Sequence, residues 1–211
     1  MSKLFLASYF SGVSSLFPAF AGNDYAGKRV AFIPTASLPE KVTFYVGADK
    51  KALQKLGLIV EELEISSAPY AETERVISDA DYIFVTGGNT FFLLQELKRT
   101  GADKLIAEHI SKGKPYIGSS AGSMILAKNI GYVKHMDSSK AAPSLQEDFS
   151  ALAVIDFCIV PHYTNAPFKK AAEKITREFS AALDLRPISN HQAIVVDGES
   201  IETLAVEKKQ K

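Results

Sequence analysis

The chain has 211 residues, of which 46% are hydrophobic and 23% are charged, and its 24 basic side chains balance its 24 acidic ones. This composition is typical of a globular protein and not of a disordered or membrane one, and the even charge balance gives no support for nucleic-acid binding. No apolar run approaches the roughly 20 residues that a membrane-spanning helix requires. We therefore expect a single globular domain over 1–211, with no nucleic-acid partner and no membrane association.

Cysteine usage indicates the compartment. Cys158 is the only cysteine of the chain, whereas disulfides are typical of oxidising compartments. It lies in the apolar run 154–160, where we expect a buried, unreactive thiol. The apolar stretch that begins at Leu4 is brief and soon interrupted by Ser11-Gly12, so we interpret it as a buried strand and not as a signal peptide. These features predict a cytoplasmic protein.

Apolar runs alternate with amphipathic stretches over the first 120 residues. The runs that we interpret as strands are Leu4–Ala7, Arg29–Ile33, Leu58–Leu63, Tyr82–Val85 and Pro115–Ile117. The stretches that place apolar side chains on one helical face are Lys50–Leu56, Thr90–Lys98 and Asp103–Ile110. Strands that are apolar throughout, separated by helices of about ten residues, predict an α/β fold whose mostly parallel sheet is flanked by helices on both faces.

The last third of the sequence favours antiparallel pairing. Asp197-Gly198 lies between the apolar runs 193–196 and 201–206, and this arrangement predicts an antiparallel C-terminal hairpin. A helix from about Pro167 to Leu183 is expected before the hairpin. Residues 137–151 are expected to form a surface loop.

The segment 118–122, Gly-Ser-Ser-Ala-Gly, follows the last parallel strand and opens a helix. Such a turn is typical of a nucleophile elbow, where glycines relieve the crowding between strand and helix and the central serine projects on a strained backbone. Ser120 is the candidate nucleophile because it alone has glycine two residues away on each side; Ser119 and Ser123 are its competitors. The alternative is a glycine-rich turn that binds a phosphate.

A serine hydroxyl needs a neighbouring base, usually a histidine. His162 follows the apolar run 157–161 at the sheet end where α/β proteins build their sites, so it is the leading candidate. The alternative is a structural histidine at the strand end. His135 and His191 each lie near a plausible loop and stay open, whereas His109 lies in a polar helical stretch and is expected to be exposed.

The base must be held in one tautomer by an acceptor, and two residues are candidates. Asp137 is an ionisable group in the loop after the elbow helix, and Asn190 is a neutral amide just before a terminal strand. An amide oxygen can orient an imidazole but stabilises the imidazolium less than a carboxylate does. For both residues the alternative is ordinary turn chemistry.

A second glycine turn, Gly87-Gly88-Asn89, also lies between a strand and a helix. Its bare backbone could bring an N–H group to a substrate carbonyl, beside the N–H of Ala121, so that the two form an oxyanion hole. Asn89 is then a candidate substrate contact. The alternative is that Asn89 caps the following helix.

Three segments of the chain resemble the peptidase E family, the aspartyl dipeptidases whose relatives include cyanophycinase. They are Ile83–Phe91, Ile117–Gly122 and Val160–Asn165, and their order and rough spacing match. The resemblance covers about residues 28–200. It implies a fold similar to the class I glutamine amidotransferases, with serine in place of cysteine at the elbow, and a short peptide with a free amino terminus as the substrate.

The resemblance also implies roles for individual residues. It makes Ser120 the nucleophile, His162 the base, and Gly88 with Ala121 the oxyanion donors. For the third member the family is divided between an aspartate in the loop after the elbow and a glutamate near the C-terminal strands. Asp137 matches the first across a longer loop, and Asn190 stands where the family has the glutamate.

Specificity is the other point of comparison. The resemblance to peptidase E implies that a basic residue after the histidine segment holds the aspartyl side chain of the substrate. Lys169, Lys170 and Arg177 are candidate counterparts. The alternative for them is a solvated helix face.

These patterns together predict a serine peptidase that hydrolyses short peptides, with N-terminal aspartyl preference as a hypothesis. No metal or organic cofactor is required, and a homodimer stays open. A non-catalytic module that holds a small anion or a peptide on the same scaffold is the alternative, favoured by Asn190. An esterase of the α/β-hydrolase type is disfavoured, since that fold places its acid before the histidine and typically needs a longer chain.

Overall fold

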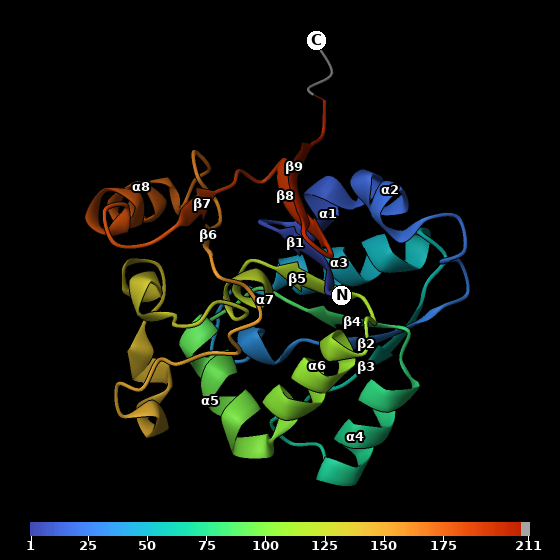
Figure 1. The fold of residues 1–211 in the computed structure, drawn as a ribbon. Coiled ribbons are helices and arrows are strands. Elements are labelled where there is room, and N and C mark those ends of the chain that lie inside the picture. Colours follow the sequence, from blue (N-terminus) through green and yellow to red (C-terminus); the bar gives the residue numbers. More distant parts are fainter. Residues whose placement is uncertain (208–211) are drawn as a thin grey trace.

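The computed structural model describes residues 1–207 and is built around one seven-stranded sheet (Figure 1). Its strands run in the order β3-β2-β4-β5-β1-β8-β9. The pairs from β3 to β1 are all parallel, whereas β8 pairs antiparallel with β1 and β9 antiparallel with β8. The predicted fold class, a mostly parallel sheet with an antiparallel C-terminal hairpin, is therefore confirmed.

The strands keep close to the apolar runs of the sequence. Their bounds are β1 (Lys3–Ala7), β2 (Arg29–Ile33), β3 (Ile59–Glu62), β4 (Tyr82–Val85), β5 (Tyr116–Ser119), β8 (Gln192–Asp197) and β9 (Ser200–Ala205). A separate parallel pair is formed by β6 (Cys158–Val160) and β7 (Leu185–Pro187). The strand β7 was not predicted, because its three residues are too few for a periodicity signal.

Helices cover both faces of the sheet. They are α1 (Phe10–Val13), α2 (Phe17–Ala21), α3 (Phe44–Lys55), α4 (Tyr70–Asp79), α5 (Thr90–Thr100), α6 (Ala102–Ser111), α7 (Ala121–Met124) and α8 (Lys169–Phe179). The α3 helix begins six residues before the predicted helix at Lys50, and α1, α2 and α4 were not predicted. None of the helices between residues 1 and 207 combines the length and apolar character needed to cross a bilayer.

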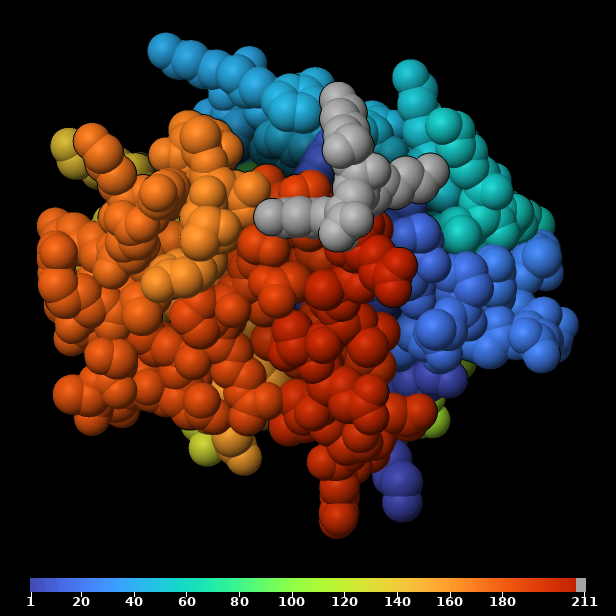
Figure 2. Space-filling model, turned by 90° about the horizontal axis from the view of Figure 1, so that it is seen from above, coloured from blue at the N-terminus to red at the C-terminus, as the bar shows by residue number. Residues whose placement is uncertain are grey.

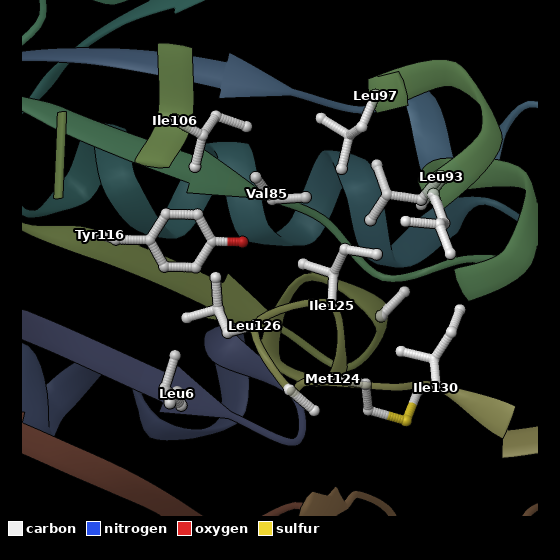
Figure 3. Packing of buried hydrophobic residues seen from close by; sticks show 14 of the residues in the cluster. Leu6, Val85, Leu93, Leu97, Ile106, Tyr116, Met124, Ile125, Leu126 and Ile130 are labelled. Atoms are coloured by element: carbon white, nitrogen blue, oxygen red, sulfur yellow. The ribbon is translucent and has the colours of Figure 1, made fainter. Parts of the chain in front are cut away.

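Two hydrophobic cores lie on opposite faces of the sheet, because successive strand residues point to opposite sides. Leu4 and Leu6 of β1 join the core beneath α4, α5 and α6. Figure 3 shows this core close to α7, where Ile125 and Leu126 lie among Val85 and neighbouring side chains. The opposite core is aromatic and is covered by α1, α2 and α3; its rings include Phe5, Phe10, Phe17, Phe20, Phe32 and Phe84.

A side lobe carries the chain from the elbow helix back to the hairpin. It contains three short 3-10 turns, η3 (Gly131–His135), η4 (Ser139–Ala141) and η5 (Pro143–Leu145), followed by β6, α8 and β7. Figure 2 shows the orange part of this lobe beside the red C-terminal hairpin. The predicted helix 167–183 is α8, which is shorter at both ends. The lobe thus places the end of β6 next to the main sheet.

The exposure of Cys158 and His109 tests two expectations from the sequence. Cys158 is 9% exposed, which confirms the expected buried thiol. His109 is 4% exposed, so the expectation of a solvated histidine was wrong. Its ring turns inward to bond the Pro115 carbonyl oxygen at 3.1 Å, and burial lowers the pKa of His109 to about 4. A polar neighbourhood in sequence did not reveal this inward orientation.

Candidate active site

Ser120 lies at the junction of β5 and α7 in a backbone conformation that side chains rarely adopt. Its φ is 50° and its ψ is −106°, and a positive φ is disfavoured for any residue with a Cβ. The Ser120 N–H donates to the Ala7 carbonyl of β1 at 3.0 Å, which anchors the turn. The strained turn presents the hydroxyl at the carboxyl edge of the sheet, as an elbow does.

The two glycines of the elbow are sterically required. A Cβ at Gly122 would lie 2.1 Å from the carbonyl oxygen of Val85, and one at Gly118 would lie 2.5 Å from the carbonyl oxygen of Gly122. Both obstacles are backbone atoms, which cannot rotate away as a side chain can. The close approach of β4, β5 and α7 therefore depends on these positions having no side chain.

His162 lies within hydrogen-bond distance of Ser120. Its Nε2 is 2.9 Å from the Ser120 Oγ, and its ring stacks on Phe168 with centroids 5.0 Å apart. His162 lies two residues after the end of β6 and has a φ of 59°, a second strained position. Burial lowers the pKa of His162 below its ordinary value, although the hydrogen bond with Asn190 acts in the opposite direction. The imidazole is thus neutral near pH 7 and able to accept a proton.

The structure separates the two candidates for orienting the base. Asn190 Oδ1 lies 2.7 Å from His162 Nδ1. Asp137 instead accepts from the Thr90 N–H at 2.8 Å and from its hydroxyl at 2.6 Å, at the start of α5, and makes no hydrogen bond to His162. Burial raises the pKa of Asp137 to about 6. The amide, and not the carboxylate, therefore contacts the imidazole.

Two backbone N–H groups lie beside the nucleophile. The N–H of Ala121, at the first position of α7, has no acceptor within residues 1–207, and the same holds for the N–H of Gly88. A Cβ at neighbouring Gly87 would lie 3.3 Å from the Ser120 Cβ, so the second glycine turn rests against the elbow. A Cβ at Gly88 would lie 2.1 Å from the Ala36 carbonyl oxygen, which excludes any side chain there. The geometry suits an oxyanion hole.

The three residues expected to contact substrate lie in different environments. Asn89 is 5% exposed and caps α5: its Oδ1 accepts from the Phe92 N–H at 3.0 Å and its Nδ2 donates to the Ser138 carbonyl. Both the oxygen and the nitrogen of its amide thus have a partner within the protein, which favours the cap over a substrate contact. Lys169 opens α8 directly after Phe168, and Arg177 lies in the last turn of α8, exposed. Of the two basic residues, Lys169 is the one next in sequence to Phe168, whose ring stacks on His162.

The remaining histidines lie apart from the nucleophile. His135 Nε2 bonds the Glu178 carboxylate at 2.5 Å and so joins η3 to α8. His191 is exposed and makes no side-chain hydrogen bond within the described part of the chain. No group of three His, Cys, Asp or Glu side chains in residues 1–207 is placed to hold a metal ion.

Ser8 is a member of the site that the sequence analysis missed. It is the first residue after β1 and is fully buried, and its hydroxyl oxygen lies 2.7 Å from the His162 backbone nitrogen and 2.8 Å from Asn190 Oδ1. The only available signal was its place at the carboxyl end of a buried strand, the edge where α/β sites form. A lone serine at that place is too common to single out.

Comparisons with known proteins agree over nearly the whole chain. A model of peptidase family S51 matches residues 2–204. An uncharacterized peptidase of Listeria innocua is 53% identical over 203 residues, covering 96% of both chains, and one of Pasteurella multocida is 54% identical over 200 residues, covering 95% of this chain and 96% of that one. Peptidase E of Shewanella baltica OS155 is 34% identical and covers 81% of this chain and 68% of its own.

Solved structures give the same picture. A crystal structure from Listeria monocytogenes EGD-e, assigned provisionally to peptidase E, is 52% identical with a TM-score of 0.93 and covers 98% of this chain and 100% of that one. A peptidase structure from an acI-B1 actinobacterium is 20% identical with a TM-score of 0.69, covers 98% of this chain and 88% of that one, and shares the fold.

Proposed function

The chain belongs to peptidase family S51 and is a serine peptidase, and from this premise we propose that it cleaves short peptides through an acyl-enzyme formed on Ser120. The observation that carries the proposal is the 2.9 Å contact between Ser120 Oγ and His162 Nε2 at a strained elbow. A neutral imidazole at this distance is the arrangement that general-base activation of a serine requires.

The proposed reaction follows from these positions. His162 Nε2 takes the hydroxyl proton as Ser120 Oγ bonds to the peptide carbonyl carbon, and the carbonyl electron pair moves to its oxygen. The N–H groups of Ala121 and Gly88 stabilise that oxyanion. The intermediate collapses as His162 returns the proton to the leaving amine, and a water molecule then hydrolyses the ester by the same route.

The orienting amide limits this mechanism. Asn190 carries no charge, so it fixes the ring without stabilising the imidazolium that forms in each transition state. A carboxylate would do both. We therefore expect a base that is correctly aimed but less strongly assisted than in a Ser-His-Asp triad.

Negative charge beside the site supports a substrate with a free amino terminus. A hollow of about 560 Å³ is lined in part by Glu40, Glu62 and Glu64. Lys50 pairs with Glu62 at 2.7 Å, whereas the Glu40 carboxylate has no hydrogen bond or ion pair within residues 1–207. The hollow adjoins the second glycine turn, because Ser37, which lines it, would lie 2.6 Å from a Cβ at Gly88. An ammonium group would be attracted there.

Preference for an N-terminal aspartyl residue is the finer part of the proposal. Lys169 follows Phe168, whose ring stacks on His162, and we infer that its ammonium group binds a carboxylate held near the imidazole. Its nearest acidic partner, Glu173, is 3.9 Å away, a weak contact that a substrate could replace. Opposite charges on two sides of the site would suit a short zwitterionic peptide.

A fluorophosphonate probe tests the proposal most directly. We expect it to label the native protein at Ser120, as located by mass spectrometry, and not to label Ser120→Ala. That variant should lose roughly 10⁴-fold or more in turnover of a short peptide while keeping its melting temperature. Ser139→Ala, in the surface turn η4, is the matched control and should keep both labelling and activity.

Absence of labelling would contradict the acyl-enzyme mechanism. If a peptide or a small anion then bound equally well to the native protein and to Ser120→Ala, the non-catalytic binding module would be the better description. Labelling at Ser119 or Ser123 would instead assign the nucleophile to a neighbour.

A cytoplasmic location is also part of the proposal. Cys158 has no cysteine to pair with in the 211-residue sequence, and stable disulfides are characteristic of oxidising compartments. Fractionation of the native cells should recover the peptide-cleaving activity in the cytoplasmic fraction.

A further inference from the structure

Ser8 connects the base to its orienting amide. Its oxygen lies 2.7 Å from the His162 backbone nitrogen, 2.8 Å from Asn190 Oδ1 and 3.3 Å from His162 Nδ1. The residue is fully buried. Every hydrogen bond of its hydroxyl must therefore be made inside this cluster.

Counting donors and acceptors fixes the direction of each bond. A hydroxyl has one proton and two lone pairs, and the His162 backbone N–H can only donate, so it occupies one lone pair of Ser8. The Ser8 proton then goes to Asn190 Oδ1 at 2.8 Å, the nearest acceptor. Asn190 must turn its oxygen, and not its NH₂ group, toward the cluster.

The orientation of the amide determines the tautomer of the base. With Oδ1 facing the ring at 2.7 Å, His162 Nδ1 carries the proton and donates it. The lone pair is then on Nε2, which faces Ser120 Oγ at 2.9 Å. With the amide reversed, its NH₂ would donate to Nδ1, the proton would move to Nε2, and the base could not accept from the nucleophile.

The amide alone cannot make this choice, because an Asn side chain offers similar shapes in its two orientations. In the reversed orientation the only acceptor left for the Ser8 proton would be His162 Nδ1, which is 3.3 Å away and would already accept from the Asn190 NH₂ group at 2.7 Å, so one of the two buried donors would lack a good partner. A carboxylate at position 190 would present oxygen either way. The need for a second group that selects the orientation thus arises from Asn190 itself.

We propose that Ser8 is a positioning residue for the peptidase reaction: its hydroxyl holds the Asn190 oxygen toward His162 and thereby keeps the imidazole in the tautomer that can deprotonate Ser120. This inference rests on the proposed function. It adds a fourth residue whose role is to select an orientation, with no contact to substrate.

A double-mutant cycle tests the role. Ser8→Ala in the native background should lower kcat about 10- to 100-fold with little change in KM, the fold-change that corresponds to losing the orienting bond. In an Asn190→Asp background the same substitution should cost several-fold less, because a carboxylate has no wrong orientation. An equal loss in both backgrounds would overturn the inference, since a purely structural role predicts that result.

Nitrogen NMR of histidine-labelled protein provides a readout without substrate. The native protein should show His162 with its proton on Nδ1, and Ser8→Ala should show a mixture or the reversed tautomer. Ser123→Ala is the matched control: it also removes a buried hydroxyl bonded at the end of β1, at 2.8 Å from the Ala7 oxygen, but it does not contact the imidazole. It should keep the native tautomer.

The two levels of the proposal fail in different ways. A native protein that no fluorophosphonate labels would contradict the peptidase mechanism, whatever Ser8 does. A labelled, active native protein whose Ser8→Ala variant keeps both kcat and the Nδ1 proton would contradict the role of Ser8 and leave the mechanism intact.

Discussion

The two halves of the site are built by different kinds of interaction. The nucleophile half is local: Ser120 and both glycines that shape its turn lie within the five residues 118–122. The base half is assembled from Ser8, His162 and Asn190, which are separated by up to 182 residues in the chain. The shape of the first half depends on steric exclusion at its two glycines beside one anchoring backbone hydrogen bond, from Ser120 to Ala7, whereas the second half is held by side-chain hydrogen bonds.

This difference predicts different responses to mutation. An added methyl group that meets backbone atoms either fits or displaces a strand. Its effect on the fold is therefore all or none. Hydrogen bonds can be lost one at a time, at about 0.5–1.5 kcal/mol each and more for buried groups. We expect changes at the elbow to affect folding, and changes at the base to affect rate and pH dependence.

Gly122→Ala should have the largest effect on the fold. Its Cβ would lie 2.1 Å from the Val85 oxygen, so β4 or α7 must move, and we expect the free energy of unfolding to fall by about 3 kcal/mol or more. Urea denaturation measures it. Gly47→Ala in α3 is the control, since nothing lies within 4 Å of its Cβ, and it should gain about 0.5–1 kcal/mol. Equal stabilities for the two variants would remove the steric half of the comparison.

Asn190→Asp should change the base half without affecting the fold. A carboxylate 2.7 Å from His162 Nδ1 favours the imidazolium and should raise the pKa of His162, in a site where burial now lowers it. The acidic limb of the kcat/KM profile should move up by about one pH unit or more, and the plateau rate should rise. An unchanged profile would mean that Asn190 does not act through the imidazole.

Replacing Asp49, on the elbow side of the site, should have a smaller effect, and it should change stability alone. Asp49 is fully buried and accepts the Ser11 N–H at 2.9 Å, and its Oδ2 has no hydrogen-bond partner among residues 1–207. Burial raises the pKa of Asp49 from 3.8 to about 7. The folded protein therefore holds this proton more tightly than the unfolded chain, so the contribution of Asp49 to stability is greatest below about pH 4 and is lost as the pH rises toward 7.

Asp49→Asn should remove that decline. We expect unfolding free energies measured from pH 4 to 8 to vary less in this variant than in the native protein. Asp156→Asn, at an exposed carboxylate, should keep the native slope. A native slope in both variants would show that Asp49 stays ionised in the folded protein.

The smallest effect is expected for Lys169, at the outer edge of the base half of the site. Lys169→Ala should raise KM for a peptide with N-terminal aspartate by about tenfold or less, since the side chain is 56% exposed and its charge is screened. Arg177→Ala, in the last turn of the same helix, should leave KM unchanged. Comparison with an N-terminal alanyl peptide separates charge recognition from general binding. Equal effects of both variants would argue against aspartyl selection by Lys169.

The same division explains what could be predicted from the sequence. The parallel sheet and the elbow follow from short-range patterns, because apolar runs and glycine spacing act on neighbouring residues. Asn190 could not be chosen over Asp137, since that choice depends on which loop the side lobe brings to His162. Ser8 was missed because its importance lies entirely in contacts 154 and 182 residues away.

The place of β1 in the sheet also has a consequence for synthesis on the ribosome. This strand lies between β5 and β8, so the Ala7 carbonyl that anchors Ser120 and the hydroxyl of Ser8 leave the exit tunnel before the elbow does. Asn190 and its strand emerge well after the elbow. A nascent chain can therefore complete its elbow first, but it has no properly oriented base until β8 is released, so peptide cleavage should begin only after that strand has left the ribosome.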